Sequence, residues 1–318
     1  PDLTAVIRIF ARGQQQTDAL EKQKPWLTKL KYALLHRRNR NSQAGSKKNI
    51  LAHYDLGNEL YTRFLDPEMM YSSAIYPDEN ADLAQAQLHK LDTICQRLDL
   101  KESDHLLEIG TGWGGLAIYA AQHYGCKVTT TTISDAQHEY AKNRIEQLGL
   151  TDKITLLKQD YRELTGEYDK LVSIEMIEAV GYEYLPSFFQ QCNQRLKKGG
   201  KLLIQSITIA DQRFEYYKYN VDFIQRYIFP GGFLPSITAL SENLTKHTDL
   251  VTETIDDIGL DYAKTLAHWR EAFLASWSEL TPFGYDEQFK RLWLYYFAYC
   301  EGAFIERSTS AVHLVARK

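Results

Sequence analysis

A short apolar run that leads through a glycine-rich turn into a helix constrains the fold of this chain more than any other feature. Residues 106–115 read Leu-Leu-Glu-Ile-Gly-Thr-Gly-Trp-Gly-Gly. Glycines in such a turn permit positive φ angles and let a ligand pack directly on the backbone. The spacing differs from the dinucleotide fingerprint, Gly-x-Gly-x-x-Gly, which also has its acidic residue on the second strand. Here Glu108 ends the first strand, where a carboxylate suits a positively charged ligand.

The residues around two further strand ends indicate S-adenosylmethionine, which carries an ammonium group and no pyrophosphate. Asp160 ends the third expected strand, and Tyr161 beside it is placed to bracket an adenine. The second expected strand lacks the terminal acid that commonly holds ribose hydroxyls, so Thr132 and Gln137 are expected to supply neutral hydrogen bonds there. For the glycines alone, a tight βα turn without a ligand remains the alternative.

From about residue 105, short apolar runs alternate with helical segments, which is typical of βαβ units. We therefore predict a seven-stranded, doubly wound α/β sheet of the class I S-adenosylmethionine-dependent methyltransferase type (Rossmann-like), with helical lid insertions and an N-terminal helical extension. The stretch 209–249 is too long for a simple loop and is expected to carry helices that cover a site. The expected strands are His105–Gly110, Cys126–Thr132, Ile154–Asp160, Tyr168–Met176, Gly200–Thr208, Leu250–Ile258 and Ala311–Arg317. The expected helices are Gly115–His123, Ala136–Leu148, Tyr184–Leu196, Tyr262–Leu280 and Asp286–Glu306.

Composition excludes several classes of protein. With 44% hydrophobic and 25% charged residues, the 318-residue chain is neither disordered nor collagen-like. No apolar run approaches the roughly 18–20 residues of a membrane-spanning helix. The four cysteines are widely spaced and form no CxxC pair. This spacing argues against a disulfide framework or a zinc site, and it favours a reducing compartment.

The basic residues are unevenly distributed along the chain. Residues 22–48 contain no Asp or Glu, although the whole chain has a net charge of −4. This asymmetry points to an anionic partner, and a merely solvated helix face remains the alternative. We expect helices over 1–21 and 25–38 and a mobile polar linker over 39–48. Residues 1–48 are interpreted as the remnant of an N-terminal domain plus a basic linker, and residues 49–318 as the catalytic domain. The basic residues of this segment are Lys22, Lys24, Lys29, Lys31, Arg37, Arg38, Arg40, Lys47 and Lys48.

Nearly the whole chain from residue 49 onward resembles the cyclopropane fatty acid synthases and mycolic acid cyclopropane synthases. The order and spacing of the motifs make this resemblance specific at the level of the family. The motifs that carry it are His53–Asn58, Leu65–Ala74, Glu108–Gly115, Thr132–Gln137, Gln159–Arg162, Met176–Gly181 and Tyr227–Ser236.

The resemblance implies methyl transfer from S-adenosylmethionine to the cis double bond of a phospholipid acyl chain. The resulting carbocation loses a proton from the added methyl group, and a cyclopropane ring closes. An alkene is a weak nucleophile, so the sulfonium must be held in line with it and water excluded. Some of the 21 Tyr, 13 Phe and 5 Trp residues are expected to shield the cation, and most to pack the core.

The resemblance also assigns the residues of the cofactor and proton-acceptor sites. In this family the proton acceptor is a bicarbonate ion held by a Cys, a Glu, a His, the backbone of an Ile, and a Tyr. Those positions are Ser73, Glu178, Gln205, Ile207 and Tyr262 here, so the Cys and the His are replaced. The residues expected at the cofactor are Tyr71, Ser72, Glu108, Gly110, Gly112, Trp113, Thr132, Ile133, Gln137, Tyr161 and Arg162.

The two replacements leave neutral donors around the expected anion. Ser73 and Gln205 offer an O–H and an N–H₂ group, so bicarbonate or an equivalent small anion is expected, although a glutamine cannot carry positive charge. Tyr262 is expected to be the partner of Glu178. Cys300 matches a cysteine once regarded in the family as a nucleophile, but direct transfer needs none, and inert packing is the usual role of such a residue.

Several alternatives stay open at this point. The altered pocket is also compatible with methyl-branched or methylene fatty acids as products. A small-molecule N-methyltransferase is weakened by Glu178-Ala179, since those relatives typically have Glu-His. A catalytically inactive lipid-binding relative is suggested only by Ser73 and Gln205.

The expected partner is a phospholipid acyl chain at an anionic membrane surface, and no nucleic acid or metal is expected. Peripheral attachment to the inner face of the membrane, from the cytoplasm, follows from a bilayer substrate and the basic segment with its Trp26–Leu35 apolar face. A homodimer is left open.

Overall fold

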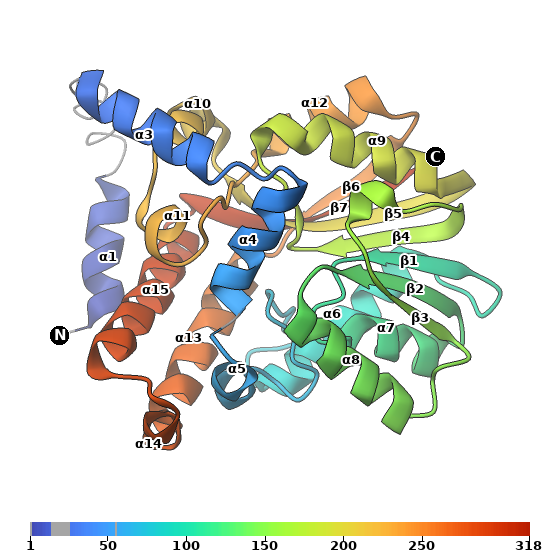
Figure 1. The fold of residues 1–318 in the computed structure, drawn as a ribbon, viewed down its shortest axis with the longest axis horizontal. Coiled ribbons are helices and arrows are strands. Elements are labelled where there is room, and N and C mark those ends of the chain that lie inside the picture. Colours follow the sequence, from blue (N-terminus) through green and yellow to red (C-terminus); the bar gives the residue numbers. More distant parts are fainter. Residues whose placement is uncertain (1, 14–25, 55) are drawn as a thin grey trace.

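A mixed β-sheet forms the centre of the chain in a computed structural model, which describes residues 2–13, 26–54 and 56–318 (Figure 1). Within these residues the sheet has seven strands in the order β3-β2-β1-β4-β5-β7-β6. β7 is antiparallel to β5 and β6, while the pairs from β3 to β5 are parallel. The strands are β1 His105–Ile109, β2 Lys127–Thr132, β3 Ile154–Lys158, β4 Tyr168–Ile174, β5 Leu196–Ile209, β6 Val251–Asp257 and β7 Thr309–Arg317. The predicted fold and all seven predicted strands are confirmed.

Successive residues of the strands face opposite sides of the sheet, and each side has its own apolar core. Leu107 and Ile109 pack on one side, under α9 (Leu185–Arg195) and α12 (Ile237–His247). Leu106 and Val128 pack on the other side, against α6 (Leu83–Arg97), α7 (Gly115–Tyr119) and α8 (Asp135–Gln147). Burial on both faces explains why the parallel strands read as nearly continuous apolar runs.

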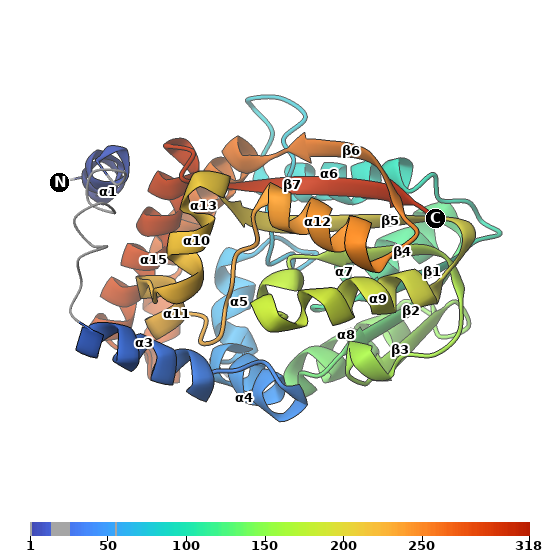
Figure 2. The ribbon, with the colours of Figure 1, turned by 90° about the horizontal axis from the view of Figure 1, so that it is seen from above.

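A group of helices packs beyond the carboxyl ends of the parallel strands, on the left of Figures 1 and 2. Its aromatic core includes Phe64, Trp269, Trp293 and Phe297, all buried. α1 lies along α15, where Thr4 donates to Glu301 at 3.0 Å. The helices of this group are α1 Leu3–Arg12, α3 Trp26–Arg38, α4 Gln43–Tyr54, α5 Asn58–Phe64, α13 Gly259–Ala275, α14 Trp277–Leu280 and α15 Glu287–Ile305.

Within the described residues the predicted helices are present, with shifted ends; of the helix predicted over 1–21, residues 14–21 lie outside the described residues. The stretch 209–249 carries α10 (Asp211–Tyr219), α11 (Phe223–Tyr227) and α12, as expected. The helix predicted to end at Leu196 stops at Arg195, because Leu196 already pairs with Tyr168 in the sheet. The long helix predicted over 262–280 divides into α13 and α14 around Ser276.

The prediction of a polar linker over 39–48 is wrong from Gln43 onward, since α4 begins there and also crosses the expected domain boundary after residue 48. Polar groups from distant parts of the chain hold this segment. Asn41 is buried; its amide donates to the carbonyl of Gly231 at 2.8 Å and accepts from Asn49 at 2.9 Å. Arg162 donates to the carbonyl of Asn41 at 3.2 Å. A sequence window cannot reveal partners that lie more than 100 residues away.

We expect Asn41→Ala to lower the free energy of unfolding by about 1–3 kcal/mol, because it leaves buried polar partners unsatisfied. Gln43→Ala is the matched control, since the Gln43 amide bonds Glu163 at an exposed site. Urea denaturation of both variants measures the difference, and equal stabilities would contradict the anchoring role of Asn41.

Candidate active site

A cavity of about 150 Å³ lies at the carboxyl ends of β1, β2 and β4, where ligands bind in open α/β sheets. All eleven residues expected at the cofactor line it, together with Asp160 and Glu175. The structure thus brings the predicted set to one place, while the assignment of each residue to a part of the cofactor stays a prediction.

The first wall of this cavity is the glycine turn after β1. Gly110 has φ +101°, and a Cβ atom there would come within 3.2 Å of the Met176 side chain, so only glycine suits this turn. Glu108 is buried at the strand end and accepts a hydrogen bond from Thr130 at 2.6 Å. Burial raises the pKa of Glu108 to about 8. A cation beside this carboxylate would offset the cost of its desolvation.

The opposite wall is formed by residues after β2 and β3. Asp160 and Arg162 form an ion pair at 2.8 Å, and the guanidinium lies 5.3 Å from the centre of the Tyr161 ring. Thr132 donates to the Gln137 side-chain oxygen at 3.1 Å. The two neutral residues expected at the ribose are therefore joined to each other, and Arg162 connects this wall to the Asn41 segment.

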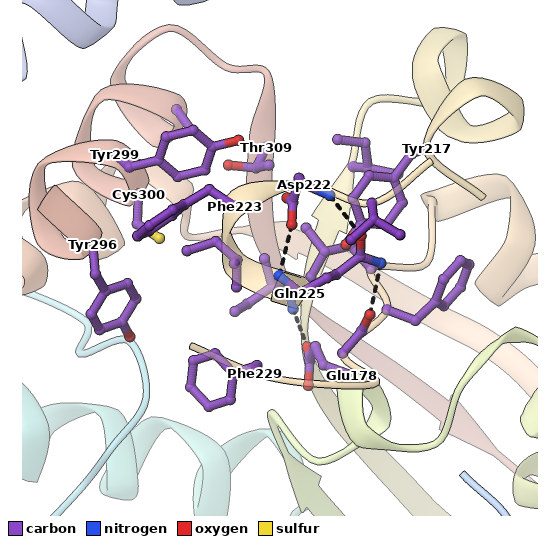
Figure 3. A pocket seen from close by; sticks show the side chains of 18 of the residues that line it. Glu178, Tyr217, Asp222, Phe223, Gln225, Phe229, Tyr296, Tyr299, Cys300 and Thr309 are labelled. Atoms are coloured by element: carbon purple, nitrogen blue, oxygen red, sulfur yellow. Dashed lines mark hydrogen bonds between the residues drawn. The ribbon is translucent and has the colours of Figure 1, made fainter. Parts of the chain in front are cut away.

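A second, larger cavity of about 640 Å³ adjoins the first (Figure 3). Its walls are mainly aromatic and aliphatic and come from α1, α10, α11, α13 and α15. Figure 3 shows Phe223 beside Tyr299 and Cys300, while Phe229 lies lower in the view, near Glu178. Four of the described residues line both cavities and so mark their junction: Ser46, Tyr71, Glu175 and Ala179.

Glu175 lies at this junction, and the sequence analysis missed it. Its Oε1 accepts from the backbone N–H of Ser73 at 2.9 Å and from the Gln205 amide at 2.8 Å. Its Oε2 accepts from the Tyr262 hydroxyl at 2.7 Å. Three residues that were expected to hold a small anion thus hold the carboxylate of Glu175. The Ser73 hydroxyl does not take part, since it donates to the carbonyl of Ala74.

Glu178 has a different environment from the expected one. Tyr262 bonds Glu175, so the expected pairing of Tyr262 with Glu178 is wrong. The backbone N–H of Ile207 donates to Glu178 Oε1 at 2.6 Å. The other oxygen, Oε2, is buried and has no hydrogen-bond partner among the described residues. Burial and, next, the charge of Glu175 raise the pKa of Glu178 to about 8.

The backbone of Glu175 has an unusual conformation, which the sequence alone does not show. Its φ is +47°, in the left-handed region that few residues with a side chain adopt. Such strain is concentrated at functional sites. In the sequence, Glu175 was read as the interior of a strand extending to Met176, whereas β4 ends at Ile174. The sequence did contain one signal for Glu175, which is an acidic residue directly after the strand that neighbours β1. The strand order reverses between β1 and β4, and ligands bind at such a point of an open α/β sheet.

Comparison with known sequences identifies the family. The profile of the mycolic acid cyclopropane synthetase family matches residues 41–314. The chain belongs to this family. It is 42% identical over 256 residues to the cyclopropane-fatty-acyl-phospholipid synthase of Escherichia coli, and this alignment covers 80% of this chain and 64% of that protein. It is 39% identical over 271 residues to the tuberculostearic acid methyltransferase of Mycobacterium tuberculosis, with 83% and 63% covered.

The chain spans less than two thirds of the length of these two relatives. Among solved structures, the mycolic acid cyclopropane synthase CmaA1 in complex with SAH and CTAB matches with a TM-score of 0.79. The identity is 25%, over 86% of this chain and 98% of that one. The fold is thus the one found in class I S-adenosylmethionine-dependent methyltransferases of the cyclopropane synthase family.

Within this family member, Cys300 lies on the wall of the larger cavity. Burial raises the pKa of its thiol well above the ordinary range. A thiol that resists ionisation is a poor nucleophile, so its environment agrees with a packing role.

The buried carboxyl groups of this cyclopropane synthase family member give a prediction for stability. Because the pKa values of Glu108 and Glu178 are raised to about 8, the folded state retains protons that the unfolded state releases above about pH 4.5. The free energy of unfolding should therefore decrease as pH rises from 5 to 8, by up to about 4 kcal/mol for each group. Urea denaturation at several pH values measures this slope.

Glu108→Gln and Glu178→Gln should each flatten that pH dependence and raise stability at pH 8. Glu102→Gln is the control, because this carboxylate is exposed to solvent. A stability that rises from pH 5 to 8 in the unsubstituted chain would contradict the prediction.

Proposed function

We propose that this chain transfers the methyl group of S-adenosylmethionine to the cis double bond of a phospholipid acyl chain, and that Glu175 accepts the proton whose loss closes a cyclopropane ring. The observation that carries the proposal is the position of the Glu175 carboxylate. It is partly buried and lies at the junction of the smaller cavity at the strand ends, which the residues expected at the cofactor line, and the larger cavity. A reaction between a cofactor and an acyl chain needs a base at such a junction.

The smaller cavity fits S-adenosylmethionine in its donor set. Glu108 offers a buried carboxylate to the ammonium group, and the glycine turn lets the backbone approach the ligand. Tyr161 and Arg162 offer ring and guanidinium faces to an adenine. The cofactor would supply an electrophilic methyl group on a sulfonium. The relative CmaA1, which matches 86% of this chain, was solved with SAH, and this supports the assignment.

The larger cavity fits an acyl chain. Its aromatic walls include Tyr71, Phe229 and Tyr296, and the hydroxyls of Tyr71 and Tyr296 bond each other at 3.0 Å. Ring faces stabilise a nearby cation, and an apolar wall keeps water from capturing it. An alkene carbon beside Glu175 would attack the methyl group and release the neutral thioether. The adjacent acyl carbon would then carry the positive charge.

The proton from the added methyl group passes in our proposal to Glu175, and its C–H electron pair closes the ring. Glu175 and Glu178 have separate roles because their surroundings differ. Burial raises the pKa of Glu175, but the donors Tyr262, Ser73 and Gln205 oppose this rise. The pKa of Glu178 is raised further by the charge of Glu175. We assign the shared proton to Glu178, whose Oε2 has no hydrogen-bond partner among the described residues, and the role of base to Glu175, which accepts three hydrogen bonds.

Glu175 takes the place of the bicarbonate that the sequence analysis expected. Its carboxylate already receives the donors of Gln205, Tyr262 and the Ser73 backbone. We propose that no bound bicarbonate is needed, since a carboxylate of the chain offers the same chemistry at the same group of residues.

A methyl-branched or methylene fatty acid is the second candidate product; the 39% identity to a tuberculostearic acid methyltransferase favours a branched product, and the methylene form needs no reductant. A hydride shift from the methyl-bearing carbon to the adjacent cationic carbon would move the positive charge onto the methyl-bearing carbon. Loss of a proton from the methyl group to Glu175 would then form a double bond between the chain carbon and the added carbon instead of a ring. The same residues serve both outcomes, so the products must be identified chemically.

We expect methyl-labelled S-adenosylmethionine and vesicles of a cis-monounsaturated phospholipid to yield lipid-bound label, with cyclopropane signals in the NMR spectrum. Glu175→Gln should reduce the product by about 10²–10⁴-fold, the usual contribution of a general base. Glu178→Gln, the matched control, should stay within about tenfold, because a protonated carboxyl group and an amide have similar shape and hydrogen bonding.

Other results would exclude the proposal or select an alternative. Full activity of Glu175→Gln would exclude its role as the base. Methylene signals without cyclopropane would select the second product. Label only in an added amine would indicate an N-methyltransferase, and cofactor binding without transfer would indicate an inactive relative.

We further propose peripheral attachment to an anionic membrane through α1 and α3. Phe10 lines the larger cavity although 71% of its surface is exposed, and Leu34 on α3 is 58% exposed. Lys31, Arg37 and Arg38 of α3 are exposed to solvent. Arg40 is paired with Glu183, and Lys22 and Lys24 lie outside the described residues. No helix in the described ranges is long and apolar enough to cross a membrane.

Replacing Lys31, Arg37 and Arg38 together with Gln should weaken binding to anionic vesicles about tenfold or more, since each basic residue near the surface contributes ~1 kcal/mol. Sedimentation at two salt concentrations measures the loss. The matched control replaces Lys101, Lys127 and Lys198, which are exposed near the opposite ends of the strands. Equal binding by both triple variants would refute the proposed surface.

A further inference from the structure

Gln205 connects Glu175 to a buried histidine on the neighbouring strand. His313 of β7 lies directly across from Gln205 of β5 in the sheet. His313 Nε2 and Gln205 Oε1 are 2.7 Å apart, and Gln205 Nε2 lies 2.8 Å from Glu175 Oε1. On its other side, His313 Nδ1 lies 2.6 Å from an Arg97 nitrogen. Both His313 and Gln205 are fully buried.

The chemistry of arginine determines the direction of every hydrogen bond in this chain of contacts. A guanidinium can only donate, so His313 Nδ1 must accept from Arg97. The proton of the neutral imidazole therefore lies on Nε2, which donates to Gln205 Oε1. With its oxygen engaged in this way, Gln205 turns its N–H₂ group toward Glu175 and the carbonyl of Ser73.

We propose that His313 is a positioning residue, which acts through Gln205 to hold an N–H donor, rather than a carbonyl oxygen, against the carboxylate of Glu175. This inference rests on the proposed function, in which Glu175 accepts the proton. A reversed Gln205 amide would direct its oxygen at Glu175 and its N–H₂ group at the N–H of His313. Both contacts would be repulsive, and the ionised form of Glu175 would lose a hydrogen bond.

The surrounding charges are consistent with a fixed, neutral histidine. Arg97 and Lys90 of α6 both face His313, and burial together with these cations lowers its pKa well below the ordinary value. Glu175 faces Lys90, Tyr262 of α13 and Glu178. Arg97 also lies 3.5 Å from Asp256 of β6, so its guanidinium is held from two sides. Burial and the two neighbouring cations therefore favour the neutral form of His313.

The test compares His313→Met with His313→Gln. The two substituents have similar length and volume, but only glutamine can donate an N–H to Gln205 and accept from Arg97. The rate of methyl transfer at saturating S-adenosylmethionine is measured from pH 5 to 9 with cis-monounsaturated phospholipid vesicles. Thermal denaturation records the fold of each variant.

We expect His313→Met to lower kcat about tenfold, the effect of one oriented hydrogen bond, with an unchanged KM for S-adenosylmethionine. The acidic limb of its pH–rate profile should move to higher pH, because Glu175 without its N–H donor is harder to ionise. His313→Gln should restore both kcat and the limb. Contributions of Glu108 and Glu178 to the profile are common to all three proteins and cancel in the comparison.

Other outcomes overturn the inference in distinguishable ways. If His313→Met keeps the kcat and the acidic limb of the unsubstituted chain, or if both variants lose activity with an unmoved limb, His313 has only a structural role. If Glu175→Gln is as active as the unsubstituted chain, the proposed base is wrong whatever His313 does. If His313→Met does not fold, His313→Gln still decides, since a displaced limb in this folded variant contradicts the positioning role.

Discussion

The three hydrogen bonds to the partly buried carboxyl group of Glu175 are the interactions on which the rest of the site depends. Burying an ionised carboxylate is costly unless several donors surround it. Here the donors come from the segment before β1, from β5 and from α13. Each donor must lie within hydrogen-bond distance, so one carboxyl group connects elements that are almost 200 residues apart. The two cavities meet where this carboxyl group lies.

The fold could be predicted from local patterns because each pattern has a local cause. Apolar runs bounded by glycine and polar residues marked the strands, and all seven are present. The glycine turn after Glu108 located the carboxyl edge of the sheet. Even the residues expected at the cofactor line one cavity, since parallel strands end at a common edge.

The anion site could be predicted only in part, because its geometry depends on long-range contacts. Ser73, Gln205 and Tyr262 were expected around a small anion, and in the structure they donate to the side-chain carboxyl group of Glu175. The family motif identifies Glu178, which lies three residues after Glu175, so the sequence analysis did not consider Glu175. The Asn41 segment was misread for the same reason: its partners Gly231 and Arg162 lie far away in the sequence.

The left-handed backbone at Glu175 has a consequence for how the charge is supplied. A dissolved anion occupies its site according to its concentration and affinity, whereas a side chain of the chain itself is always present. Its effective concentration is set by the backbone and does not vary with the medium. Under the proposed function, the supply of base in this protein is independent of the bicarbonate pool. The cost is local strain at one residue in place of a binding equilibrium.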